Sequence, residues 1–120
     1  MLNKSHRIQQ NKEYQRIYKD SRPIYVGNLI LRLKKNNLSD TDKSVTRFGF
    51  VVSNKIDKRA TRRNNLKRKL RGIADELLSE IKSGYDIVLI VKNNYAYPYD
   101  YDLIKKDFVA GLEKLQVLNA

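Results

Sequence analysis

The sequence predicts a single-domain α+β sandwich in which three helices pack on a small sheet. Three stretches carry apolar residues at the i, i+3, i+4 spacing of an amphipathic helix, and they alternate with strand-like stretches. With 120 residues the chain suffices for one hydrophobic core and is too short for two. No repeat, low-complexity tract or linker divides it, so we expect residues 1–120 to form one domain, with residues 1–8 flexible.

A short helix is expected to begin at Asn11 and to end before Pro23. Asparagine is a good N-cap residue, whereas proline disfavours a helical conformation in the residue before it. One face of this helix would carry Tyr14, Ile17 and Tyr18, at the i, i+3 and i+4 spacing.

Two strands joined by a long hairpin loop are expected next. The side chains of residues 24–34 would alternate between two faces, as in a strand, and residues 45–53 are predicted to form the returning strand. The polar residues 35–44 between them are too many for a tight turn. In the first strand, one face would carry Leu29, Leu31 and Leu33, and the other face Asn28, Ile30 and Arg32. In the second strand, one face would carry Phe48, Phe50 and Val52.

The second half of the chain predicts a helix, a strand and a helix. A helix over residues 61–82 would have Thr61 as its N-cap and would end at Gly84. Residues 86–91 are apolar on both faces after the first residue, which suits a strand well inside a sheet. The last helix is expected at 101–115. The buried stripe of the first helix is Leu66, Leu70, Ile73, Leu77 and Ile81, and that of the last is Tyr101, Ile104, Phe108, Leu112 and Leu115.

The charge of the chain is its strongest functional signal, because 25 lysine and arginine residues face 13 acidic ones, a formal net charge of +12. A compact domain with this charge repels itself, so the charge indicates a polyanionic partner, with nucleic acid as the leading candidate. An anionic membrane surface is the second candidate. It requires a basic helix whose apolar face is free to insert, and here that face is needed for the core. Solubility alone is the third explanation.

Several classes of protein are excluded by composition. No apolar run approaches the ~18 residues of a membrane span, and the basic start lacks the apolar stretch of a secretory signal, so we expect a cytoplasmic protein without a membrane partner. The absence of cysteine excludes disulfides, thiolate zinc sites and a cysteine nucleophile. His6 is the only histidine, and the acids form no metal-ligand pattern. We therefore expect no catalytic residue and no metal site in the chain itself.

The segment K58-R-A-T-R-R-N-N-L-K-R-K-L-R71 has eight basic residues and no acidic one in fourteen positions. On a helix, Asn64, Lys67, Arg68 and Arg71 share one flank, beside the apolar stripe that anchors the helix. Arginine forks onto phosphate oxygens and lysine adds point charge, so this flank suits a nucleic-acid backbone. Positive charge in the first half of a helix also opposes the helix dipole, a conflict that indicates a functional reason. The alternative is a solvated charged face.

The aromatic residues suggest a second site, since eight of the eleven are tyrosines. Tyr14 and Tyr18 are one helical turn apart, and a strand face with Ile30 and Arg32 lies beside them if the helix crosses the sheet. Exposed rings next to cations form a stacking platform for unpaired bases. The alternative, which we favour when the tyrosines are taken alone, makes both of them core residues with solvated hydroxyls. The tyrosines of residues 95–101 are expected to pack the loop before the last helix.

From about residue 7 to residue 115 the chain resembles the protein subunit of bacterial ribonuclease P. Four segments carry the resemblance: N11-K-E-Y-Q-R-I-Y-K19, R47-F-G-F-V-V-S-N-K55, R63-N-N-L-K-R-K-L-R71 and Y85-D-I-V-L-I-V91. The basic helix is the most specific of them, because the family has an Arg-Asn-Arg triplet followed by a Lys-Arg pair and a further arginine. The matching positions here are Arg63, Asn64, Lys67, Arg68 and Arg71.

The resemblance implies both a fold and a mechanism. The fold is a ribosomal protein S5 domain 2-like sandwich, with a small mixed sheet and a left-handed βαβ crossover, an exception to the usual right-handed rule. The family enzyme removes the 5′ leader from precursor tRNA, and its catalyst is an RNA that requires magnesium. The protein would bind that RNA through Arg59, Arg62, Arg63, Asn64, Lys67, Arg68 and Arg71. The groove for the leader would consist of Tyr14, Tyr18, Ile30, Arg32, Ser53 and Lys55.

The partners implied are therefore ribonuclease P RNA and precursor tRNA, with the protein a monomer in the complex and inactive alone. Two positions depart from the family pattern. Asn65 replaces the third residue of the triplet, an arginine, while Arg59 and Arg62 add positive charge nearby, and Arg32 stands where an aromatic residue is common. At Arg32 a phosphate contact is expected in place of stacking. The alternative function is a structural RNA-binding protein of the ribosomal type with no processing role.

Overall fold

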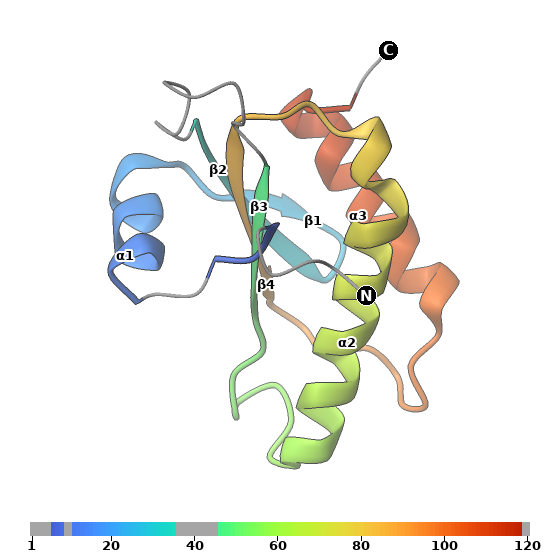
Figure 1. Ribbon diagram of the computed structural model, residues 1–120. Coiled ribbons are helices and arrows are strands. Elements are labelled where there is room, and N and C mark those ends of the chain that lie inside the picture. Colours follow the sequence, from blue (N-terminus) through green and yellow to red (C-terminus); the bar gives the residue numbers. More distant parts are fainter. Residues whose placement is uncertain (1–5, 9–10, 36–45, 119–120) are drawn as a thin grey trace.

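The computed structural model describes residues 6–8, 11–35 and 46–118. In the described residues a four-stranded mixed sheet has α1 on one face and α2 and α3 on the other (Figure 1). The sheet order is β1-β2-β4-β3. The elements are α1 Asn11–Asp20, β1 Ile24–Val26, β2 Leu29–Lys35, β3 Arg47–Val51, α2 Ala60–Leu77, the 3-10 helix η3 Leu78–Glu80, β4 Tyr85–Val91 and α3 Tyr101–Leu115. The predicted α+β class is confirmed.

The single strand expected at 24–34 is wrong, because the chain reverses at Gly27 and Asn28 to form the antiparallel pair β1 and β2. Gly27 has a φ of +55°, and a Cβ there would lie 2.3 Å from a carboxylate oxygen of Asp107 in α3. That carboxylate accepts a hydrogen bond from the Asn28 N–H at 3.2 Å. A Gly-Asn pair between apolar runs is a known signal of a two-residue hairpin, so the sequence carried this turn.

The hairpin expected between residues 24–34 and 45–53 is also wrong. β2 pairs antiparallel with β4, and β3 pairs with β4 in parallel, so β4 lies between the two strands that were predicted to pair with each other. The reason is burial: β4 is apolar on both faces and occupies the interior of the sheet. β3, α2 and β4 thus form a βαβ crossover between parallel neighbours. The expected loop at 35–44 lies outside the described residues except for Lys35, which ends β2.

The helix boundaries differ from the prediction mainly in α2, which spans 60–77 instead of 61–82. Arg59, not Thr61, is its N-cap, and no side chain caps it. Asp57 accepts a hydrogen bond from the Arg59 N–H at 2.9 Å, which fixes the approach to the helix. In α3 the bounds agree with the prediction, and the Asp100 carboxylate accepts hydrogen bonds from the Asp102 and Leu103 N–H groups. No helix in the described ranges is long and apolar enough to cross a membrane.

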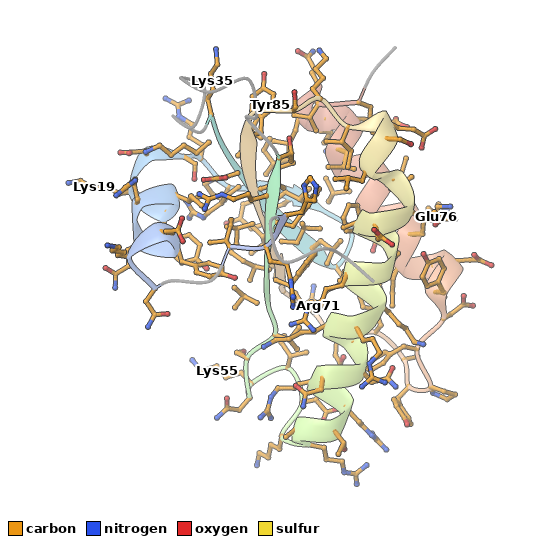
Figure 2. All side chains as sticks on the ribbon, viewed as in Figure 1. Lys19, Lys35, Lys55, Arg71, Glu76 and Tyr85 are labelled. Carbon is orange, nitrogen blue, oxygen red and sulfur yellow. The ribbon has the colours of Figure 1, made fainter. Side chains whose placement is uncertain are left out.

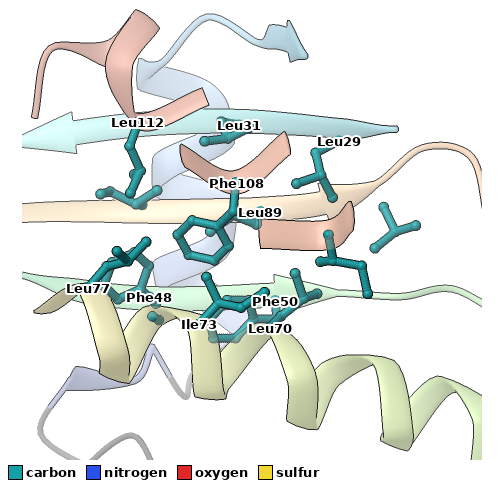
Figure 3. Packing of buried hydrophobic residues seen from close by; sticks show 14 of the residues in the cluster. Leu29, Leu31, Phe48, Phe50, Leu70, Ile73, Leu77, Leu89, Phe108 and Leu112 are labelled. Carbon is teal, nitrogen blue, oxygen red and sulfur yellow. The ribbon is translucent and has the colours of Figure 1, made fainter. Parts of the chain in front are cut away.

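The main core lies between the sheet and the two helices on its α2 and α3 side (Figure 3). Phe48 and Phe108 meet at its centre, with ring centroids 6.1 Å apart. Most of the predicted faces are confirmed, since the side chains buried here include Leu29, Leu31, Phe50, Leu66, Leu70, Ile73, Leu77, Ile104 and Leu112. Leu33, Tyr101 and Leu115 are only partly buried and pack against this core from its border. The apolar side of α2 is therefore buried in the core, and its basic flank lies outside the core.

Residues 6–8, expected to belong to a flexible start, lie along β3. The Ile8 N–H donates to the Phe48 carbonyl at 2.8 Å, and the Ile8 side chain is buried. The physical reason is that β3 is the edge strand, so its carbonyl at Phe48 is available to a neighbouring chain segment. This contact brings Arg7 close to the basic helix.

Candidate nucleic-acid interface

Helix α1 is held over the sheet by an ion-pair network that the sequence patterns do not predict. The Arg47 guanidinium donates to both carboxylate oxygens of Asp86, at 2.9 and 2.8 Å, and to Glu13 of α1 at 2.6 Å. These hydrogen bonds raise the pKa of Arg47, so it stays charged. The Asp86 side chain is only 8% exposed. The feature of the sequence that points to this network is Asp86, an acidic residue at the start of a strand that is otherwise apolar.

Tyr14 lies directly on the backbone of β3. A Cβ at Gly49 would be 2.6 Å from the Tyr14 ring, so only glycine allows this contact. The Tyr14 hydroxyl donates to the Ile8 carbonyl at 3.3 Å, and burial raises the pKa of the phenol, which keeps it protonated. The ring is therefore fixed in place, with part of its surface exposed.

Tyr18 lies one turn further along α1, beside Arg32. The Arg32 guanidinium carbon is 5.2 Å from the centroid of the Tyr18 ring. Both tyrosines pack against the small cluster of Ile8, Ile17 and Val88 on one side and border a groove on the other. Both interpretations of these residues, as core and as groove lining, thus hold in part.

The groove has a volume of about 390 Å³ and is bordered by α1, β3 and α2. We use this name for the space lined by Asn11, Tyr14, Gln15, Tyr18, Phe50, Val51, Val52 and Lys67. A smaller pocket of about 130 Å³ shares three of its residues and is lined by Arg7, Ile8, Tyr14, Phe48, Phe50, Lys67 and Arg71. The aromatic site and the basic helix, which the sequence suggested separately, therefore form one continuous surface.

Cations converge where the groove meets α2. Arg7, Lys67 and Arg71 all line the small pocket (Figure 2 labels Arg71 beside α2). The Nε atoms of Arg7 and Arg71 are buried and make no hydrogen bond within the described part of the chain. Such donors are costly when left unsatisfied. The three cations that line the pocket also make it attractive to an anionic group.

We define the basic ridge as Asn64, Lys67, Arg68 and Arg71, which all lie on α2 as predicted. Asn64 and Arg68 are exposed, and Lys67 is half-buried against the groove. Among the described residues no ion pair involves Lys67 or Arg68. Arg68 therefore offers its positive charge to solvent, and Lys67 offers its charge to the groove.

The first turn of α2 is different, because its arginines contact the chain itself. Arg63 donates to the Asp57 carbonyl at 2.8 Å, and an Arg62 nitrogen is 3.9 Å from the Asp57 carboxylate. The Arg62 guanidinium also lies 4.0 Å from the centroid of the Tyr97 ring. Arg59 is exposed. Arg62 and Arg63 thus have a structural task as well as any contact with a partner.

Four predicted groove residues do not line the groove. Arg32 donates to the carbonyls of Tyr18 and Ser21, at 3.1 and 2.9 Å, and so fixes the end of α1 instead of facing the cavity. Ile30 packs against the small cluster beneath α1. Ser53 and Lys55 are exposed in the loop after β3, as Figure 2 shows for Lys55. No group of three histidine, aspartate or glutamate side chains within the described ranges could hold a metal ion.

Comparison with known proteins identifies the family of the chain. The family model described as Ribonuclease P matches residues 2–116. The chain belongs to the ribonuclease P protein family. The ribonuclease P protein component of Synechocystis sp. is 36% identical over 90 residues, 75% of this chain and 69% of that protein. That of Pseudanabaena sp. is 33% identical over 119 residues, 99% and 98% of the two chains.

A solved structure agrees with the assignment. The Staphylococcus aureus ribonuclease P protein aligns with a TM-score of 0.80 at 28% identity, over 97% of this chain and 100% of that one. The resemblance inferred from the sequence is thereby confirmed. The chain is a bacterial-type ribonuclease P protein subunit, which partners with ribonuclease P RNA in tRNA processing. A ribosomal-type protein without a processing role does not fit this assignment.

Proposed function

We propose that the chain is the non-catalytic subunit of a cytoplasmic ribonuclease P and acts as a monomer within it. The RNA, with magnesium, hydrolyses the phosphodiester bond at the 5′ end of mature tRNA. The basic ridge, together with Arg59, Arg62 and Arg63, docks on the RNA. The groove holds the single-stranded 5′ leader of precursor tRNA.

The observation that carries this proposal is the continuity of the groove with the ridge through Lys67. Single strands are bound by a positive path for the phosphates beside aromatic rings for the bases. Here Tyr14 and Tyr18 supply the rings, and Lys67 and Arg71 supply the charge at the same edge. Structured RNA is recognised through its backbone and shape, which suits the rigid outer side of α2.

The protein's contribution to magnesium use is electrostatic in this proposal. The charge of +12 offsets the repulsion between two polyanions, the catalytic RNA and its substrate. Substrate affinity at physiological salt therefore rises, and the RNA needs less added magnesium to bind its substrate. The metal itself is held by RNA and substrate phosphates.

Reconstitution tests the proposal. The protein mixed with bacterial ribonuclease P RNA at near-physiological salt and low magnesium should cleave precursor tRNA at the mature 5′ end, whereas the RNA alone should be much slower. The protein alone with magnesium should not cleave. Cleavage by a preparation shown to be free of RNA would contradict the non-catalytic role.

The exposed Arg68 provides a test of the phosphate contacts on the ridge. Arg68→Ala should weaken binding to ribonuclease P RNA and reduce the slope of log affinity against log salt by about 0.7–0.9 for each lost phosphate contact. Lys106→Ala, which removes an exposed lysine of α3, is the matched control and should leave both unchanged. A slope in Arg68→Ala equal to that of the control would exclude a phosphate contact there.

A further inference from the structure

Tyr25 is an exposed ring that neither the core nor the groove uses. Its side chain is 55% exposed on β1, and the Lys92 Nζ lies 4.9 Å from the ring centroid. A single exposed aromatic residue needs no explanation. What distinguishes Tyr25 is its position relative to the groove.

A row of side chains connects Tyr25 to the groove across the sheet. The strand register pairs Tyr25 with Ile30, Ile30 with Ile90, and Ile90 with Val51. Residues paired in this way share one face of a sheet. Val51 lines the groove, so the row runs from the groove to the opposite edge of the sheet. Three strand spacings make this distance about 14 Å.

This row is less covered by α1 than the adjacent row, although Ile30, Ile90 and Val51 also contact the small cluster beneath that helix. The adjacent row pairs Arg32 with Val88 and Val88 with Gly49, beneath Tyr18 and Tyr14. Val88 in that row is fully buried, whereas Ile30 and Ile90 in the row that ends at Tyr25 are only partly buried. Figure 1 shows α1 over one end of the sheet on this side and no helix over the rest.

The chemistry of the row suits a single nucleic-acid strand. Ile30, Ile90 and Val51 form an apolar floor, and the exposed ring of Tyr25 ends it beside the cation of Lys92. Aromatic rings beside cations bind unpaired bases by stacking, while the cation attracts the phosphates. The direction also follows: α2, the proposed contact with the catalytic RNA, packs against β3, and Tyr25 lies on β1 at the opposite edge of the sheet.

We propose that Tyr25 and Lys92 form a second stacking site, which binds a base of the 5′ leader farther from the cleavage site than the bases at Tyr14 and Tyr18. This inference rests on the proposed function, since it extends the path of the same strand. It makes leader length a determinant of affinity, because a short leader ends in the groove and a longer one reaches Tyr25.

The test measures the affinity of the reconstituted holoenzyme for precursors whose leaders are lengthened one nucleotide at a time. The wild type should gain affinity in two steps, one at the groove and one at Tyr25. Tyr25→Thr, which keeps a strand-favouring residue on β1, should lose the second step, about 5- to 100-fold, and keep the first. Tyr25→Phe should keep both.

Tyr97→Ala is the matched control, since Tyr97 is 50% exposed and lies beside Arg62 instead of on the row. It should not alter the dependence on leader length. An equal loss in Tyr25→Thr at every leader length, or no loss at any, would overturn the second site. Wild-type affinity independent of the leader altogether would overturn the proposed function itself, so the two failures are distinguishable.

Discussion

Replacing Lys67 and Arg71 together with alanine is expected to lower the affinity of the holoenzyme for leader-bearing precursor tRNA by roughly 10- to 100-fold, as lost charged hydrogen bonds do. Both residues line the small pocket where the groove meets α2, and the buried Nε of Arg71 makes no hydrogen bond within the described residues. A leader phosphate at this point would contact both cations at once. Affinity for mature tRNA should fall far less.

The control removes the same charge from another surface. Lys106→Ala with Lys114→Ala takes two exposed lysines from α3 and likewise changes the formal net charge from +12 to +10. If this pair weakens leader binding as much as the first pair does, the effect is one of overall charge and the pocket has no special role. Thermal unfolding of both variants checks that the fold is retained.

Arg47→Met should be among the most destabilising single substitutions in the chain, lowering the free energy of unfolding by about 3–5 kcal/mol. The change leaves the Asp86 and Glu13 carboxylates, now without their shared cation, close together and partly or fully buried. Because Glu13 belongs to α1, the helix that carries Tyr14 should also shift on the sheet. Urea titration monitored by circular dichroism gives the stability.

The contrast with an exposed ion pair makes this prediction specific. Lys34→Met breaks the pair between Lys34 and Asp20, whose carboxylate side chain is 48% exposed, and should change the stability little, because solvent and salt screen this pair. Similar losses in the two variants would show that the Arg47 network contributes no more than a surface ion pair. A stable Arg47→Met protein that still discriminates leaders would show that α1 is positioned by its apolar contacts alone.

Local patterns in the sequence predicted the elements with the most regular periodicity. The stripe from Leu66 to Leu77 and the stripe from Ile104 to Leu112 are buried as expected, because each helix must cover a sheet. The pairing of the strands was not predictable in the same way. The order of β2, β4 and β3 depends on contacts between residues far apart in the chain, and adjacency in sequence suggested a hairpin that does not exist.

The candidate site was likewise predictable from local patterns only in part. The flank of Lys67 and Arg71 followed from helical geometry, and Tyr14 followed from its spacing on α1. That these residues meet depends on the approach of α1 to β3 at Gly49, a contact that no periodicity encodes. Arg32 was misplaced for a related reason. Its position on the strand face was right, but the carbonyls at the end of α1 satisfy its guanidinium.

The most direct test of the account compares the affinity of the reconstituted holoenzyme for precursor tRNA and for mature tRNA at near-physiological salt. If the groove and the ridge together hold a single strand beside the catalytic RNA, the precursor should bind more tightly. The advantage should shrink as the leader is shortened to nothing. Equal affinities for the two tRNAs, with a folded protein in a catalytically active complex, would contradict the account.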